Sequence, residues 1–169
     1  MSPSAPEPDR APTSEPVDKP VDEPADYHVD VALRWSDMDA YGHVNNVQYL
    51  RLLEEARVQA FEDWFGGHHV GDRGMVIGRS EIEYLLPLEH RIAPIAIEVW
   101  VTQVAAASFD LGYRVVDGTG GPDQRVYALA ETTLVAYDLT RGVPIRLEPR
   151  HREALDRHRG GPVPFRRRR

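Results

Sequence analysis

The chain has 169 residues, 41% of them hydrophobic and none of them cysteine, and its formal net charge is −7. This length supplies one domain with a full core, and the lack of cysteine excludes disulfides, a thiolate nucleophile and cysteine metal sites. Residues 28–145 hold seventeen acids and nine bases, which argues against nucleic acid as a partner because such binding needs a basic face. No apolar run approaches the roughly 20 residues of a membrane span, and no basic-then-apolar leader is present, so we expect a cytoplasmic protein.

Both ends of the chain have compositions typical of disordered tails. Residues 1–27 include seven prolines and seven acids and almost no large apolar side chain, so they cannot bury enough surface to offset their ordering entropy. Residues 159–169 end in the run Arg166–Arg169, which indicates a solvated basic tail rather than a binding element. We therefore predict one ordered domain over residues 28–158.

The ordered part begins with a strand and a long helix. Residues 28–35 alternate apolar and polar side chains, which predicts a half-buried strand. After a polar turn, residues 46–65 repeat apolar side chains at spacings of three and four, which predicts a helix. Asn45 or Asn46 can cap its start, and Gly66 can end it.

The rest of the chain predicts an antiparallel sheet. Alternating or apolar runs separated by short turns predict four further strands and a short final helix, at residues 75–84, 93–104, 108–116, 125–137 and 148–158. The order is strand, long helix, four strands, which predicts an α+β fold. A five-stranded antiparallel sheet of this kind can bury its apolar face by curling around the central helix.

The polar segment between the first strand and the helix has the composition of a reaction site. Residues 36–46 lie at the edge of the core and lead into a helix N-terminus, where about four backbone N–H groups lack intrahelical partners. A carboxylate at this place can act as a nucleophile or a base. The free N–H groups can stabilise an oxyanion formed on an attacked carbonyl.

The same segment resembles a known enzyme family. The run RWSDMDAYGHVNNVQYLRLLEEAR, residues 34–57, is similar to the signature of hotdog-fold thioesterases of the 4-hydroxybenzoyl-CoA thioesterase type. Its stretch GHVNN, residues 42–46, also resembles the acyl-carrier-protein thioesterases of plants. Weaker matches follow in the expected order, among them SFDLGYRVVD at 108–117 and ETTLVAYD at 131–138. The resemblance covers about residues 28–155.

The resemblance implies a fold, a reaction and an assembly. The fold would be a hotdog fold, and the enzyme would hydrolyse acyl-CoA or acyl-carrier-protein thioesters to free acid and thiol, without a metal or an organic cofactor. Two chains would pair their sheets edge to edge, giving a homodimer or homotetramer with active sites at the dimer interface. An open edge on a single curved sheet favours such pairing.

The resemblance also implies roles for three positions. Asp39 falls where the family has its catalytic carboxylate, acting as nucleophile or as general base on water. Asn46 falls where a backbone N–H polarises the thioester carbonyl. His43 falls where the plant enzymes have a functional histidine, but Tyr41 replaces the asparagine of the plant pattern. The residues alone leave another interpretation open, in which Asp39 only forms an Asx turn.

Six further residues are candidate substrate contacts: Tyr41, Asn45, Tyr49, Glu54, Arg79 and Ser80. Three of them have a structural alternative. Asn45 can instead cap the helix, and Tyr49 can instead be a core aromatic. Glu54 can position water or pair with Arg51 or Arg57.

Three more features of the sequence need an interpretation. Arg79 and Ser80 lie in a strand, from which they can meet the substrate or the CoA phosphates. Asp37 is either a turn residue or a second catalytic carboxylate. The pair His68-His69 has no acidic ligands at a suitable spacing, so we expect no metal site.

Two other functions remain compatible with the same fold. Hotdog hydratases or dehydratases that act on acyl-CoA carry an aspartate followed four or five residues later by histidine, often with a proline between. Asp39 and His43 have a related spacing without that proline. A non-catalytic acyl-CoA-binding module is the second alternative, although such a binder has little need of a carboxylate beside the carbonyl.

Overall fold

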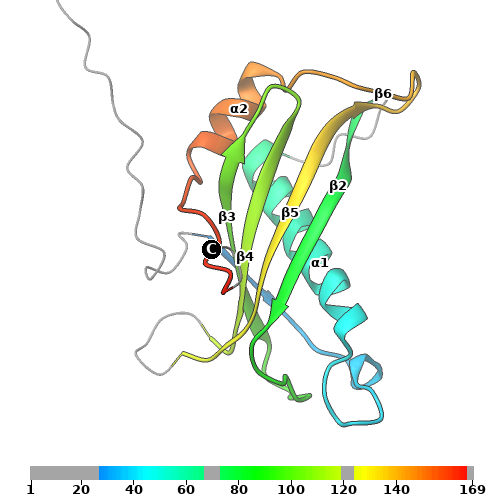
Figure 1. Cartoon of the computed structure of the whole chain (residues 1–169), viewed down its shortest axis with the longest axis vertical. Coiled ribbons are helices and arrows are strands. Elements are labelled where there is room, and N and C mark those ends of the chain that lie inside the picture. Colours follow the sequence, from blue (N-terminus) through cyan, green and yellow to red (C-terminus); the bar gives the residue numbers. More distant parts are fainter. Residues whose placement is uncertain (1–26, 67–72, 119–123, 167–169) are drawn as a thin grey trace, which may run out of the picture.

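A long helix lies against the concave face of a curved antiparallel sheet in the computed structural model, which describes residues 27–66, 73–118 and 124–166 (Figure 1). The elements in chain order are β1 (His28–Val31), the 3-10 helix η1 (Trp35–Asp37), α1 (Asn46–Phe65), β2 (Arg73–Tyr84), β3 (Ile95–Val104), β4 (Ser108–Val116), β5 (Val126–Asp138), β6 (Val143–Pro144) and α2 (Pro149–Asp156).

The sheet has the order β1-β3-β4-β5-β2, and every neighbouring pair is antiparallel. The predicted α+β architecture, with five strands around a central helix, is confirmed, and the two-residue β6 adds a sixth strand beside β5. β1 ends at Val31, earlier than the alternation to residue 35 predicts, because the chain turns into η1 at Trp35. β2 and β1 are the two edge strands.

The core lies between α1 and the inner face of the sheet. Leu52, Leu53, Ala56 and Ala60 of α1 are at most 1% exposed, and they pack in one cluster with alternate side chains of β3, β4 and β5. The two alanines allow the helix to approach the sheet closely. Each fully buried leucine contributes about 1.5–3 kcal/mol to folding.

Both ends of α1 are set by local chemistry. The side chain of Asn45 accepts a hydrogen bond from Val47 N at 3.0 Å, which makes Asn45 the N-cap. Gly66 ends the helix in the left-handed region with φ 75°, a conformation that costs glycine no steric strain. The predicted helix boundaries are therefore confirmed.

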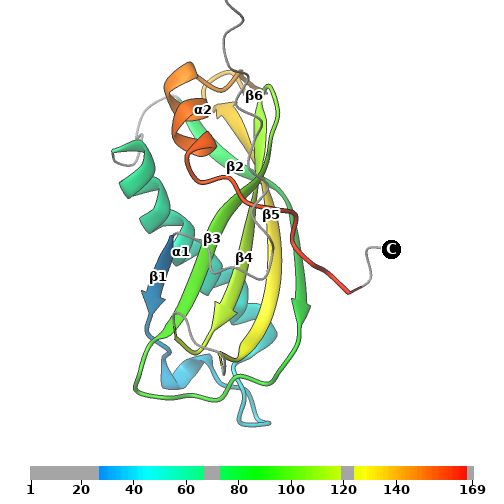
Figure 2. The same cartoon turned by 90° about the vertical axis from the view of Figure 1, so that its left-hand side faces the viewer.

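The outer face of the sheet carries a segment that the sequence predicts to be a disordered tail. Residues 158–166, here called the C-terminal arm, pack on this face, and Val163 and Phe165 are 3% and 7% exposed. Figure 2 shows the arm leaving α2 and crossing the strands. The prediction of a disordered tail from residue 159 is wrong up to Arg166, because apolar side chains on the outer face supply a burial site. Residues 1–26 and 167–169 lie outside the described part of the chain.

Trp100 on β3 anchors the beginning of the arm. Its indole N–H donates to the carbonyl of Gly161 at 2.8 Å. Its ring lies between two glycines: a Cβ on Gly112 would stand 2.5 Å from the ring, and a Cβ on Gly160 would stand 2.6 Å from it. The absence of both side chains is what allows the arm to lie flat on β3 and β4.

Candidate active site

The segment that joins β1 to α1 forms a small, tightly hydrogen-bonded loop. Met38 and Val44 form an antiparallel bridge, and Asp39 N donates to His43 O at 2.9 Å. Gly42 closes the turn: its N–H donates to Asp39 O at 3.1 Å, and its φ of 78° lies in the left-handed region that favours glycine. The sequence therefore fixes the backbone of residues 38–44 through one glycine and short-range hydrogen bonds.

Longer-range contacts hold this loop against the core. Val44 N donates to Leu88 O at 2.7 Å, and His43 bridges Glu89, so the loop pairs with the segment that follows β2. Asn45 N donates to Asp37 O at 2.8 Å. These bonds place the stretch before the loop side by side with the first residue of α1.

Asp37 is a structural residue of this loop. It is 2% exposed, and its Oδ2 accepts from Arg34 N at 2.8 Å and from Arg51 Nη2 at 2.7 Å. Arg51 lies on the second turn of α1, so the ion pair ties the loop to the helix. With its carboxylate occupied in this way, Asp37 fits the interpretation as a turn residue better than that of a second catalytic carboxylate.

Asp39 is half-buried near the tip of the same loop. Its Oδ1 accepts a hydrogen bond from Tyr41 N at 2.8 Å, which is an Asx turn. Its Oδ2 has no donor among the residues that the structure describes. The carboxylate is thus held in place through one oxygen while the other is free to meet a substrate or a water molecule. The Asx turn and a catalytic role are compatible.

The start of α1 offers one free N–H group. Val47 N is bonded to the side chain of Asn45, and Gln48 N donates to Asn45 O at 2.9 Å. Asn46 N has no acceptor within the described ranges. A free amide at a helix N-terminus is a good donor to a developing oxyanion, because the helix dipole adds to its partial charge.

Tyr49 and Tyr84 lie together at this helix start. Tyr49 is 3% exposed, and its ring meets that of Tyr84 edge-on at 5.1 Å between centroids. Burial, with smaller contributions from Tyr84 and Tyr127, raises the pKa of Tyr49 to about 12, so its hydroxyl stays protonated near neutral pH. The hydroxyl of Tyr84 donates to Asn46 O at 3.1 Å. Tyr49 is therefore a core aromatic in this chain.

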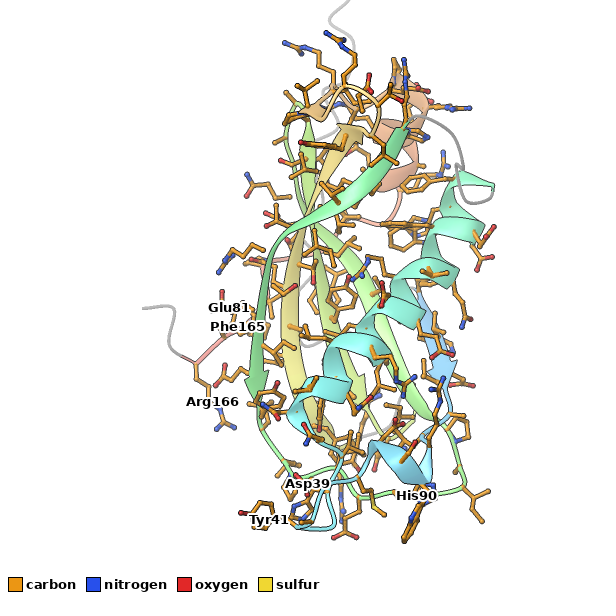
Figure 3. All side chains as sticks on the ribbon, turned by 90° about the vertical axis from the view of Figure 1, so that its right-hand side faces the viewer. Asp39, Tyr41, Glu81, His90, Phe165 and Arg166 are labelled. Atoms are coloured by element: carbon orange, nitrogen blue, oxygen red, sulfur yellow. The ribbon has the colours of Figure 1, made fainter. Side chains whose placement is uncertain are left out.

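Tyr41 and His43, two other predicted residues, lie in the same loop. Figure 3 shows Asp39, Tyr41 and His90 at one end of the molecule. Tyr41 is 85% exposed, whereas His43 is half-buried and its backbone forms a bridge with Glu89.

The ion pair expected for Glu54 is not the one that the structure shows. Glu54 lies exposed on α1. Arg51 pairs with Asp37 and with Glu55, the latter at 3.2 Å. Arg57 is buried and reaches the hydroxyl of Tyr113 at 3.4 Å. The expectation is wrong because helix position alone does not tell which of two adjacent glutamates faces the arginine.

The structure does not bring Arg79 and Ser80 to the Asp39 loop of the same chain. Ser80 precedes Tyr84 by four strand residues, which is about 13 Å along β2 at 3.3 Å per residue. Arg79 lies on the outer face, where it pairs with Glu131 at 3.2 Å and with Glu81. Figure 3 shows Glu81 beside β2, on the side away from α1.

Sequence reasoning missed the hydrogen bond between Tyr84 and the helix start. The available signal was weak, because Tyr84 is marked only by its place at the end of a predicted strand. His68 and His69 lie outside the described residues. Among the residues that are described, no three side chains gather as a metal site, and no helix is long and apolar enough to cross a membrane.

Comparison with known proteins shows the family to which the chain belongs. The sequence profile of the thioesterase-like superfamily matches residues 33–155. The chain is 30% identical to the long-chain acyl-CoA thioesterase FadM of Escherichia coli (strain K12) over 131 residues, which are 75% of this chain and 94% of that protein.

Two solved structures with a similar fold are also described as thioesterases. A putative thioesterase from Pseudomonas aeruginosa is 30% identical, with a TM-score of 0.67 over 75% of this chain and 95% of that one. A thioesterase from Thermus thermophilus, complexed with coenzyme A and zinc, is 27% identical, with a TM-score of 0.62 over 76% and 90%. The hotdog fold implied by the sequence resemblance is confirmed. The profile match includes the whole Asp39 loop and stops before the C-terminal arm.

Proposed function

The chain belongs to the thioesterase-like superfamily and is a thioesterase, and we propose that it hydrolyses acyl-CoA thioesters with Asp39 and the main-chain N–H of Asn46. One observation supports this assignment. The same loop and helix start present a carboxylate with one free oxygen, that of Asp39, and a backbone N–H without an acceptor, that of Asn46. The hydrogen bond from Asn45 N to Asp37 O keeps the two stretches adjacent.

The reaction needs charge stabilisation at one atom. Asp39 attacks the acyl carbonyl and displaces the thiolate, giving a mixed anhydride that water then hydrolyses to the free acid and the Asp39 carboxylate. Alternatively, Asp39 removes a proton from a water molecule that attacks the carbonyl, and the thiolate leaves directly. Both routes place negative charge on the carbonyl oxygen, and the Asn46 N–H donates to it. One such donor contributes about 2.7–4 kcal/mol to transition-state stabilisation. The departing thiolate is a good leaving group, so a general acid is not required.

Coenzyme A is the carrier that the comparisons support. The relative from Escherichia coli is described as a long-chain acyl-CoA thioesterase, and the Thermus structure contains coenzyme A. The proposal includes a cytoplasmic location, where coenzyme A thioesters are formed. Acyl-carrier-protein thioesters are the alternative substrate, and a direct comparison of the two carriers as substrates distinguishes them.

The proposal also includes a homodimer formed through β2. β2 is a twelve-residue edge strand. Apolar side chains accompany this edge and the start of α1: Ile77 is 52% exposed, Leu50 48% and Val47 65%. A long edge strand flanked by apolar side chains is suited to pairing with a second copy. Such pairing would bring the partner's β2 towards the Asp39 loop and give Ser80 a place in the site.

Thiol release from acyl-CoA tests the catalytic assignment. The variant Asp39→Asn retains an oxygen that can accept from Tyr41 N, so the Asx turn persists while the charge is lost. We expect kcat to fall by about 100-fold or more. Asp138→Asn is the matched control, because Asp138 also accepts a backbone N–H, from Arg141 at 2.8 Å, in a turn after β5 at the other end of the sheet. That control should keep wild-type activity.

The outcomes separate the parts of the proposal. Hydrolysis by the wild type that is lost in Asp39→Asn and kept in Asp138→Asn supports both reaction and residue. Equal rates in all three proteins would leave a thioesterase whose carboxylate is elsewhere. No hydrolysis of aliphatic or aromatic acyl-CoA by the wild type would refute the reaction itself.

A further inference from the structure

The C-terminal arm connects β3 to the opposite edge of the sheet. It begins on β3, where Val101 N donates to His158 O at 2.8 Å and Gly160 N donates to Val101 O at 3.0 Å. The match to the family profile ends at residue 155, so the arm lies outside the matched region. Its path over the outer face ends beside β2, which only β5 flanks within the sheet.

The end of the arm contacts the last residues of β2. Val163 and Phe165 form an apolar cluster with Leu129, and Leu85, which directly follows β2, packs against this cluster. Arg166 N donates to the carboxylate of Glu83 at 2.9 Å. Figure 3 shows Phe165 and Arg166 next to β2 on the side away from α1. The outer face of the strand end is thereby fixed.

Tyr84 lies between Glu83 and Leu85 in the sequence, and its side chain points to the opposite face of the sheet. Alternation along the strand places it on the α1 side, opposite Glu83 and Leu85. Its hydroxyl donates to Asn46 O at 3.1 Å, and its ring meets Tyr49 edge-on. Next along the chain, Leu85 N donates to Tyr127 O at 2.8 Å. The strand end is therefore joined to the first residue of α1, whose N–H is the proposed oxyanion donor.

We propose that Tyr84 is a positioning residue for the Asn46 N–H, and that the C-terminal arm fixes Tyr84 by clamping Glu83 and Leu85 from the outer face. This inference rests on the proposed function. A donor that must meet an oxyanion loses effect with small displacements, since a misplacement of about 1 Å can cost on the order of 100-fold in rate. Within one chain, the end of β2 would be held by β5 alone if the arm were absent. The arm supplies the second support.

The alternative is that the arm only adds stability. The apolar cluster buries Phe165, so its loss must destabilise the protein to some extent. Stability and positioning therefore have to be measured separately. Tyr84→Phe does this for the hydroxyl, because the ring that contacts Tyr49 remains.

The test is a double-mutant cycle in the full chain with Tyr84→Phe and Phe165→Ala. We expect each variant to lower kcat about 3- to 10-fold with KM changed less than 2-fold. Because both act on the same hydrogen bond, the double variant should lose no more than the more affected single variant. Burial raises the pKa of Tyr84, so its hydroxyl stays protonated in the assay range. The pH–rate profile of Tyr84→Phe below pH 9 should therefore keep its shape.

A destabilised control isolates the positioning effect. Leu155→Ala removes a fully buried side chain of α2, away from the loop, and should lower Tm while leaving kcat unchanged when assayed well below Tm. Wild-type kcat in Tyr84→Phe, or in Phe165→Ala at lowered Tm, would overturn the inference. Multiplicative losses in the double variant would also overturn it. The proposed function fails separately, if the wild type shows no Asp39-dependent hydrolysis.

Discussion

The free amide of Asn46 can be removed without breaking the helix that carries it. Asn46 is the first residue of α1, and proline is favoured at this position because the missing N–H has no intrahelical acceptor. The preceding Asn45 has φ −60° and ψ 138°, which is the extended conformation that a following proline requires. Asn46→Pro therefore deletes one donor and leaves the cap of Asn45 on Val47 intact.

The expected effect follows from the count of free donors. Val47 N and Gln48 N are already bonded, so Asn46 N is the single first-turn amide left for the substrate among those described. Its loss should cost about 2.7–4 kcal/mol of transition-state stabilisation, which lowers kcat about 100- to 1,000-fold. The stability should change by less than about 1 kcal/mol, compared with about 3 kcal/mol for proline inside a helix.

The assay compares Asn46→Pro with Asn46→Ala, which keeps the N–H and loses the side chain. Thiol release from acyl-CoA gives kcat and KM, and thermal unfolding gives Tm. We expect the alanine variant to stay near wild type. Wild-type kcat in the proline variant would refute the role of this amide. Equal losses in both variants would assign the effect to the side chain, and a collapse of Tm in the proline variant alone would contradict its placement at the helix start.

Three further predictions concern the ion pair, a buried tyrosine and the sheet edge. Asp37→Ala leaves the Arg51 side chain, 25% exposed, without its buried partner and should lower the free energy of unfolding in urea by about 2 kcal/mol; a loss below about 0.5 kcal/mol would contradict the tie between loop and helix. Because the pKa of Tyr49 is raised to about 12, its contribution to stability is complete below pH 10 and is lost as the pH rises towards 12, by about 1.4 kcal/mol per pH unit. Tyr49→Phe should flatten that fall, and unchanged steepness between pH 10 and 11 would contradict it. Ile77→Lys should convert the oligomer to a species of 19.1 kDa by light scattering; a wild type that already has this mass would refute the dimer.

Local patterns in the sequence predicted the elements that local chemistry controls. The bounds of α1 follow from the Asn45 side chain and Gly66, which act within a few residues, although the sequence left the cap open between Asn45 and Asn46. The hairpin of the Asp39 loop depends in the same way on Gly42. The alternation of Ile95, Ile97, Val99 and Val101 predicted the strand β3, and all four side chains are buried in the core cluster that contains α1.

The C-terminal arm shows why composition failed elsewhere. Its glycines, prolines and arginines resemble a solvated tail, and only Val163 and Phe165 depart from that pattern. Their burial site is built by Leu85 after β2, Trp100 of β3 and Leu129 of β5. No pattern within the arm predicts this burial site, because the site is assembled from strands that lie far away in the sequence.

The proposed active-site segment also has features that local sequence predicted and features that depend on tertiary contacts. The sequence by itself determined that a carboxylate, Asp39, stands just before a helix N-terminus in a thioesterase motif, since both features lie within a dozen residues. Only the tertiary structure decided that the Asp37 carboxylate binds Arg51 and that the Tyr84 hydroxyl donates to Asn46 O. Each of these depends on which distant groups come within hydrogen-bond distance. The packing of the helix on the sheet decides which groups come this close, and the spacing of residues along a short segment does not contain that information.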